Sequence, residues 1–562
     1  MGQTLHQSSL AILTAILLLG GFALEVAGEA VPAWQSEGAA DDFFQNLSDA
    51  FGSRNASLVG SFSASVDRDL PELRAALEPT LASLSTATAS RFGSAAVRYA
   101  LHRLFMRLRG WSLVGLDPEG QAWNGTWTSK VALLAKAPLD VRTTIQQHVD
   151  GPGLDAKGVA VLAVLLHHLA REEVAQQLRD VFTALELPLA SVLRPWAAQQ
   201  ALDAQVASQL VSRSPTSMDP AKWRRAIGRV ARVYPNWPVL QRSIHQELKR
   251  ELQVRRADFA GLAEVAGAIG ERWGRWGNSE CNSIKHELMT LEDRGSGRVR
   301  LADFYGKALH EGKWQLRESV EYLRQLGALD ETNPRNLRVI IPNYIGAAGN
   351  CIASSDIMSV CCMSECEDIM NQLEDKLRAP RATAQEIAAV VAALPSSSVP
   401  AKRDLSAVMR HRLNRIAADN DGVVPLHGRL FAQWLHHAYP RECPYPHLSG
   451  RTRQQQMNTF AQTGHNVTAT RSQMAALAGK DAQSWTRPGQ SRPLENTPWS
   501  HEEELFVPLA QQPDAWAVLH TSVFLAALAI GTLGYTLLQL VRSARRAAAR
   551  AAQVSPSKLC PV

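Results

Sequence analysis

Cysteines crowded into one short segment constrain this chain more than any other feature. The segment PNYIGAAGNCIASSDIMSVCCMSECE covers residues 342–367 and holds four of the seven cysteines. With Cys560 near the C-terminus set aside, six cysteines remain: Cys281, Cys351, Cys361, Cys362, Cys366 and Cys443. An even number of cysteines in an oxidising compartment indicates a disulfide framework. We therefore expect this segment to be a disulfide-stapled hub.

The spacing of these cysteines restricts how they pair, although six cysteines allow 15 pairings and the sequence does not select one. Cys361 and Cys362 are neighbours, so a bond between them would be strained. Cys362 and Cys366 recur with Ile369, Leu373 and Leu377 at helical spacing, which predicts one buried stripe with Cys361 off it. We therefore expect the cysteines at 361, 362 and 366 to bond to cysteines of other elements, which are Cys281, Cys351 and Cys443. Buried free thiols and a thiolate metal site remain as alternatives.

The N-terminal residues indicate secretion. Residues 10–24 form an apolar run of signal-peptide length with small residues following it, so we assign residues 1–28 to a signal peptide. No lysine or arginine precedes the run, which leaves an uncleaved anchor as an alternative. Four glycosylation acceptor sites follow, at Asn46, Asn55, Asn124 and Asn466.

A second apolar segment, residues 516–541, predicts one C-terminal transmembrane helix. Acidic residues precede it, and residues 542–562 carry five basic side chains and no acidic one. The positive-inside rule places this basic tail in the cytoplasm, which gives a single-pass type I topology. A buried core helix is the alternative. We expect the protein in the plasma membrane or an endomembrane.

The charge of the chain argues against a nucleic-acid partner. The net charge is +6, and residues 542–562 contribute +5 of it. The remainder of the chain therefore sums to +1. Because the basic excess belongs to a short tail, we expect no nucleic-acid binding.

Between the two apolar segments the hydrophobic pattern predicts a mainly α, multi-helix ectodomain. Helices are expected at residues 71–77, 94–108, 156–187, 196–211, 221–233 and 239–254, and a short strand at 339–341. We divide the ectodomain into an N-terminal helical part, 29–275, and an EF-like and cysteine-rich part, 276–448. Residues 449–515 are rich in Gln, Thr, Ser and Pro, so they are expected to form a polar, poorly ordered stalk.

Residues 292–303, EDRGSGRVRLAD, have the skeleton of a calcium-binding EF-hand loop between two helical segments. Glu292, Ser296, Gly297 and Asp303 fall at loop positions 1, 5, 6 and 12. Arg294 occupies position 3, where a carboxylate is needed, and the loop has no net charge. We expect an element that still turns helix into helix without binding calcium, and a calcium sensor is the alternative.

Histidines gather in a second candidate site within HGRLFAQWLHHAYPRECPYPH, residues 427–447. The possible ligands of zinc or copper are His427, His436, His437 and His447, together with Cys443. His436 and His437 are adjacent, so on a helix they point about 100° apart and share an ion poorly. We expect partly exposed histidines on a helix and loop, and no cofactor.

Several segments together resemble a known family. They are RYALHRLF at 98–105, RGW at 109–111, GSGRVRLADFY at 295–305, ESVEYLRQLGALD at 318–330, PNYI with NC and VCC within 342–362, and residues 427–447. Over residues 50–450 the chain resembles a family of uncharacterised single-pass membrane proteins of dinoflagellates and related protists. The resemblance implies a common ectodomain with a degenerate EF-hand-like loop, and it implies no catalytic residues.

Two classes of function follow from these patterns. The first is a non-catalytic membrane glycoprotein whose ectodomain binds an unknown protein or extracellular ligand. The second is a lumenal metal-dependent enzyme that uses the histidines of residues 427–447. We expect the first, because the chain has no HExxH, GxSxG, P-loop or GxGxxG motif.

Overall fold

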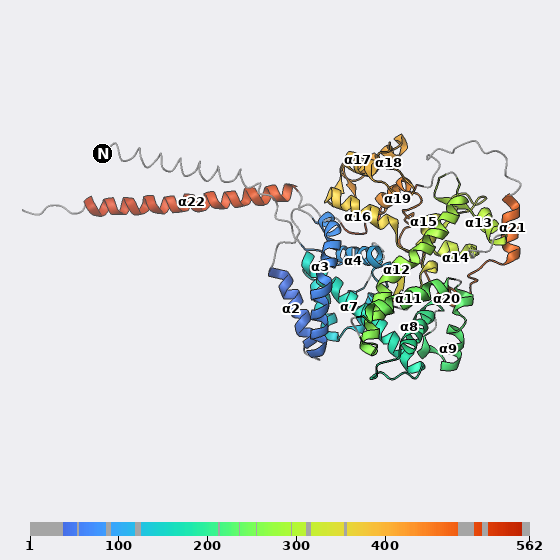
Figure 1. The fold of residues 1–562 in the computed structure, drawn as a ribbon. Coiled ribbons are helices and arrows are strands. Elements are labelled where there is room, and N and C mark those ends of the chain that lie inside the picture. Colours follow the sequence, from blue (N-terminus) through green and yellow to red (C-terminus); the bar gives the residue numbers. More distant parts are fainter. Residues whose placement is uncertain are drawn as a thin grey trace, which may run out of the picture. The chain divides into compact units, whose positions relative to one another are not determined.

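The computed structural model describes most of the chain between residues 38 and 552. The described residues are 38–52, 56–85, 91–117, 125–211, 214–234, 236–253, 256–293, 295–310, 316–352, 357–481, 499–508 and 515–552. The chain divides into two units, Met1–Pro508 and Leu509–Val562. The first unit is mainly helical with a few short strands (Figure 1), which confirms the predicted mainly α fold.

Helices account for most of the first unit. Up to the cysteine-rich segment they are α2 (Gly38–Gly52), α3 (Ala56–Leu84), α4 (Ser94–Arg109), α5 (Trp127–Lys130), α6 (Leu139–Val149), α7 (Ala156–Ala184), α8 (Pro195–Leu210), α9 (Pro220–Ile227), α10 (Val230–Val233), α11 (Trp237–Glu251), α12 (Phe259–Thr290), α13 (Leu301–His310), α14 (Val320–Gln325) and α15 (Ile341–Ile345). The later ones are α16 (Glu365–Leu377), α17 (Ala384–Ala393), α18 (Ala407–Ala418), α19 (Arg429–Ala438), α20 (Met457–Gln462) and α21 (Arg471–Asp481).

The strands are short and pair in three small antiparallel sheets. They are β1 (Trp111–Leu113), β2 (Arg298–Arg300), β3 (Leu329–Asp330), β4 (Arg338–Ile340), β5 (Met358–Val360), β6 (Arg381–Ala382) and β7 (Val424–Pro425). β1 pairs with β5, β4 lies between β2 and β3, and β6 pairs with β7. Each sheet joins segments that are distant along the chain, so the sheets fix helices relative to one another.

Local sequence signals explain where the helices begin and end. Asp155 caps α7 by accepting a hydrogen bond from the backbone N–H of Gly158 at 2.7 Å, and Asp258 caps α12 in the same way. Gly110 ends α4 in the left-handed conformation, with φ of 68°. The helix expected over 221–233 divides into α9 and α10, because the chain turns at Gly228.

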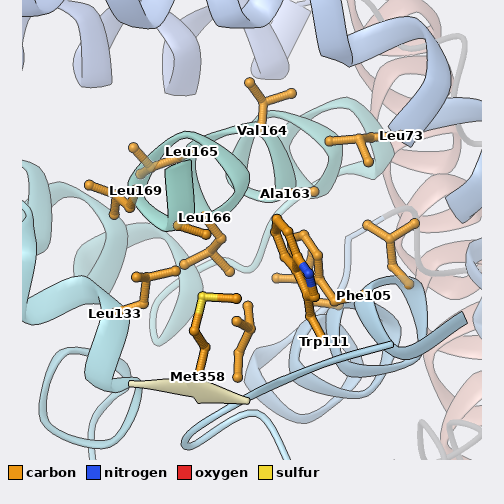
Figure 2. Packing of buried hydrophobic residues seen from close by; sticks show 14 of the residues in the cluster. Leu73, Phe105, Trp111, Leu133, Ala163, Val164, Leu165, Leu166, Leu169 and Met358 are labelled. Atoms are coloured by element: carbon orange, nitrogen blue, oxygen red, sulfur yellow. The ribbon is translucent and has the colours of Figure 1, made fainter. Parts of the chain in front are cut away.

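The largest core surrounds α7, whose central residues 159–166 are all buried. Figure 2 shows Trp111 and Phe105 packed beneath this helix, with their ring centroids 6.1 Å apart and nearly parallel. Burying each large apolar side chain contributes about 1.5–3 kcal/mol. Met358 and Val360 of β5 belong to the same cluster, so this core supports the cysteine-rich segment.

Two further cores lie in the C-terminal half of the first unit. One packs α16–α19, and the other packs the end of α12 with α13–α15 and the strands β2–β4. α12 contributes Trp273 to the large core and Leu288 to the third. The division placed at residue 276 from the sequence therefore falls inside one continuous helix.

The predicted stalk, residues 449–515, needs correction where the structure describes it. Phe460 of α20 and Met474 of α21 are buried in the third core. Arg429 of α19 donates through Nε to the backbone carbonyl of Glu502 at 2.8 Å, so residues 499–508 are also held against the domain. Widely spaced apolar side chains anchor this polar stretch, and its composition alone did not reveal them. Residues 482–498 lie outside the described residues.

The second unit contains α22 (Ala515–Ala552), which includes the segment predicted to span a membrane. Apolar side chains of its middle part are exposed, among them Leu533 at 63% and Leu540 at 66%. In the part of the chain that the structure describes, no helix has both the length and the apolar character needed to cross a membrane. The predicted signal peptide, residues 1–28, lies outside the described residues.

Candidate functional site

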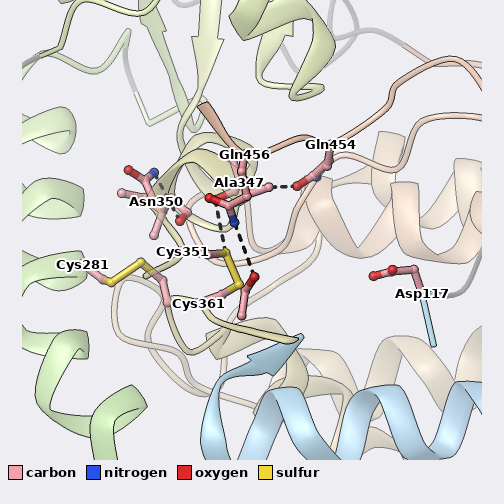
Figure 3. The surroundings of a disulfide bond; sticks show 12 residues. Asp117, Cys281, Ala347, Asn350, Cys351, Cys361, Gln454 and Gln456 are labelled. Atoms are coloured by element: carbon pink, nitrogen blue, oxygen red, sulfur yellow. Dashed lines mark hydrogen bonds between the residues drawn. A yellow bond between two sulfur atoms is a disulfide. The ribbon is translucent and has the colours of Figure 1, made fainter. Parts of the chain in front are cut away.

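The six cysteines singled out from the sequence form three disulfides. These bonds are Cys281–Cys362, Cys351–Cys361 and Cys366–Cys443. Cys361 and Cys362 bond to different partners, as their adjacency predicts. Figure 3 shows the first two bonds side by side, where the chain after β5 passes α12.

One expectation about the hub is wrong. α16 begins at Glu365 with Ser364 as its N-cap, so Cys362 lies in the extended chain before the helix and shares no helical stripe with Cys366. The extended conformation is imposed by pairing, because Cys361 donates its backbone N–H to Gly110 O at 2.7 Å. The buried residues of α16 are Ile369, Met370, Leu373 and Glu374.

The disulfides connect regions that are far apart in sequence. Two of them close loops with sequence separations of 81 and 77 residues, while Cys351–Cys361 closes a small loop with a separation of 10. Cys281 lies within α12, and Cys443 follows α19. The hub therefore ties the long helix and the α19 region to one short segment.

The EF-like loop has the predicted helix–loop–helix course, between α12 and α13. Gly297 has a φ of 70°, and a Cβ at this position would lie 1.9 Å from the carbonyl oxygen of Pro440. β2 within the loop pairs with β4, and Val299 lies opposite Val339. The loop is thus docked against two other parts of the chain.

Arginines hold the acidic side chains of this loop. Glu292 pairs with Arg441, whose Nη2 lies 2.6 Å from Oε2. Asp303 pairs with Arg300 at 2.7 Å, and Asp293 pairs with Arg338 at 3.0 Å. Ser296 Oγ is buried and makes no hydrogen bond to the described residues. Arg294 lies outside them. The acidic side chains at loop positions 1, 2 and 12 are therefore neutralised by side-chain cations.

The histidines of residues 427–447 were expected to be partly exposed, but His427, His436 and His437 are buried, and the rings of His436 and His437 lie 5.4 Å apart. His436 donates through Nδ1 to Cys443 O at 2.7 Å, and burial lowers its pKa well below the usual value. His447 donates through Nε2 to Gly327 O at 2.8 Å, and burial lowers its pKa as well. His437 stacks on Trp499 with ring centroids 5.7 Å apart. Within the described ranges, no three His, Cys, Asp or Glu side chains converge as metal ligands.

His427 belongs to a different, buried network around Glu374. The Glu374 carboxylate is fully buried and accepts from Thr80 Oγ1 at 2.7 Å, from Arg103 and from His427 Nε2 at 3.2 Å. Burial alone would raise the pKa of Glu374, but the Arg103 charge and the hydrogen bonds from His427 and Thr80 lower it to about 2. This network joins α3 and α4 to α16.

Ser83 completes a serine, histidine and carboxylate grouping that has the composition of a catalytic triad. Ser83 Oγ lies 3.3 Å from His427 Nε2, the same nitrogen that contacts Glu374. A triad needs the two ring nitrogens of histidine for two different partners. Ser83 is also fully buried. The grouping therefore stabilises the fold, and its members are too distant in sequence for any motif to reveal it.

A groove between α8 and α11 was not anticipated from the sequence. It has a volume of about 530 Å³ and is lined by Pro195, Gln199, Arg242, His245, Gln246, Leu248, Lys249, Leu252 and Gln253. His245 donates through Nε2 to Asp203, with both carboxylate oxygens 3.0 Å away, which fixes the ring at the groove wall. The spacing of Arg242, His245 and Lys249 at i, i+3 and i+7 in a predicted helix was the available signal.

The predicted glycosylation sites can be located in part. Asn46 in α2 and Asn466 before α21 are both exposed, as an acceptor asparagine must be. Asn55 and Asn124 lie outside the described residues.

Comparisons with known proteins give no further assignment. Family models, curated protein sequences and solved structures were all searched, and none of them matches this chain.

Proposed function

We propose that this protein is a single-pass type I membrane glycoprotein whose disulfide-stapled helical ectodomain binds a partner and performs no catalysis. The observation that carries the proposal is the set of three disulfides. Structural disulfides of this kind form and persist in oxidising compartments. The ectodomain therefore belongs on the lumenal or extracellular side.

In this proposal the membrane anchor is the segment of residues 516–541, and the assignment comes from its run of apolar residues in the sequence, not from a span found in the described part of the structure. Exposed apolar side chains such as Leu537, Leu538 and Val541 support it, because water would surround them on an isolated helix. Arg542, Arg545, Arg546 and Arg550 follow them directly and would meet the anionic cytoplasmic leaflet.

The contacts of the candidate sites favour a binding role over the two alternatives. A calcium sensor needs free carboxylates, and Glu292 is already paired with Arg441. A metal-dependent enzyme needs converging ligands, but in this cluster Cys443 is bonded to Cys366, and His427 contacts Glu374 in a separate network.

Protease protection combined with glycosidase treatment tests the proposal. In vesicles from expressing cells, added protease should remove only the short basic tail, and glycosidase should increase the gel mobility of the protected fragment. The double variant N46Q/N466Q should lose part of this shift. An ectodomain that is digested in sealed vesicles, or one without glycan, would overturn the topology.

A further inference from the structure

The basic charge of this chain is concentrated between residue 188, in the α7–α8 connection, and residue 256, between α11 and α12. Residues 188–256 contain twelve arginines and lysines and four acidic residues, a net charge of +8 within a chain whose total is +6. The net charge of residues 1–541 is only +1, because acidic residues elsewhere offset this basic region. Five of these cations follow one another in and between α9 and α10, and all five are exposed: Lys222, Arg224, Arg225, Arg229 and Arg232.

The acidic residues of this region do little to cancel the positive field. Asp203 is held by His245, and Asp219 caps α9 by accepting from the backbone N–H groups of Ala221 and Lys222. Glu247 is engaged by Arg250 at 2.6 Å and by Arg272. Most of the exposed cations therefore face solvent without a neutralising carboxylate, which attracts polyanions.

The α8–α11 groove lies within this basic region and supplies a defined binding geometry. Arg242 and Lys249 line it, and neither side chain pairs with another residue that the structure describes. They are seven residues apart on α11, so their Cα atoms are separated by about 10 Å along the helix axis. Gln199, Gln246 and Gln253 add amide groups to the lining of the groove.

The chemistry of the groove favours a polysaccharide over other polyanions. Amide side chains both donate and accept, which suits the hydroxyl groups of a sugar. Trp196 is the neighbour of the lining residue Pro195 in the sequence and is 62% exposed, so its indole offers an apolar face for a sugar ring outside the groove itself. The disulfides place this surface in an oxidising compartment, away from nucleic acids.

We infer that the α8–α11 groove, with the exposed cations of α9 and α10, binds a sulfated or carboxylated polysaccharide. This inference rests on the proposed function, because it names the class of partner that the ectodomain binds. Arg242 and Lys249 would contact sulfate or carboxylate groups about 10 Å apart along the polymer, and the neighbouring arginines would attract the rest of it. Such binding weakens steeply as salt rises, because counterions are released on association.

Heparin is a suitable probe for the full-length chain in detergent. The groove variant R242Q/K249Q should bind immobilised heparin at least about tenfold more weakly than wild type at physiological salt, with a smaller dependence on salt. The matched control R451Q/R453Q removes two exposed arginines outside the region and should bind like wild type. Equal melting temperatures and disulfide maps would show that the variants are folded.

Three results would overturn the inference. In the first, wild-type protein is released from heparin below physiological salt. In the second, the groove variant and the control variant lose heparin binding equally. In the third, wild-type protein binds a double-stranded DNA of matched length more tightly than it binds heparin. Protease protection in the same cells reports the topology independently. Loss of heparin binding with an intact lumenal ectodomain would therefore reject the polysaccharide and leave the proposed function standing.

Discussion

Arg441 Nη2 lies 2.6 Å from Glu292 Oε2, and 149 positions separate the two residues in the sequence. Glu292 stands at the first position of the EF-like loop, and its other oxygen accepts from the backbone N–H of Gly297. A guanidinium therefore lies against the carboxylate that would contact calcium. It also links the loop to the chain that carries Cys443, so the loop is held closed by protein groups alone.

This arrangement predicts that the loop binds no calcium. Titration calorimetry of the purified protein at millimolar calcium should detect no binding to residues 292–303, because Arg441, Arg338 and Arg300 already neutralise Glu292, Asp293 and Asp303. R441Q should bind no calcium either, since two of the three pairs remain. A micromolar dissociation constant that is abolished by E292Q would contradict this prediction and favour a calcium sensor.

The sequence predicts elements whose signals are local and misses contacts made across the fold. Periodic apolar residues place α4, α7 and α11 within a few residues, and the even cysteine count indicates the disulfides. Cys362 was wrongly assigned to a helix because its spacing to Cys366 fits a helical period, while the backbone bond from Cys361 to Gly110 keeps the chain extended. No local pattern could show that Arg441 would meet Glu292. A sum over the whole chain also concealed the basic region of residues 188–256.

Removing one long-range disulfide should lower stability measurably. The variant C366S/C443S opens a loop with a sequence separation of 77 residues, and we expect a loss of about 2–5 kcal/mol, because the unfolded chain regains conformational freedom. Thermal unfolding followed by circular dichroism measures the effect. C560S is the matched control and should unfold like wild type. Equal melting temperatures for all three proteins would show that this disulfide adds no stability.

Glu318 should make the stability of the fold depend on pH near neutrality. Its carboxyl is buried, accepts from Tyr344 at 3.1 Å, and leaves Oε2 without a hydrogen bond to any described residue. Burial raises its pKa to about 7, so the folded state favours the protonated form. The stabilisation is full below the unfolded pKa, near 4.5, and is lost as the pH rises through about 7.

The variant E318Q tests this because glutamine stays neutral at every pH. Its stability should exceed that of wild type above pH 7, by on the order of 3 kcal/mol, and the difference should vanish near pH 4. Chemical denaturation of the two proteins at several pH values measures the difference in stability above pH 7 and its disappearance near pH 4. E321Q changes an exposed glutamate three residues further along the chain, in α14, and should follow the wild-type curve. If the stability of the wild-type protein rose between pH 5 and 8, and E318Q removed that rise, the predicted direction of the pH dependence would be wrong.

The buried pair of Arg103 and Glu374 should be strongly coupled. Glu374 is fully buried, and Arg103 donates to it and, at 2.5 Å, to Glu367. The variant R103M leaves the Glu374 charge with too little compensation, and we expect a loss of about 3–5 kcal/mol in the free energy of unfolding. E374Q should also destabilise the fold, because the Arg103 guanidinium then keeps only one carboxylate partner.

The double variant R103M/E374L replaces both charges with apolar groups, so its loss of stability should be smaller than the sum of the losses of the single variants. Denaturant unfolding of the four proteins gives the coupling free energy. Additive losses would show that these two charges do not stabilise each other.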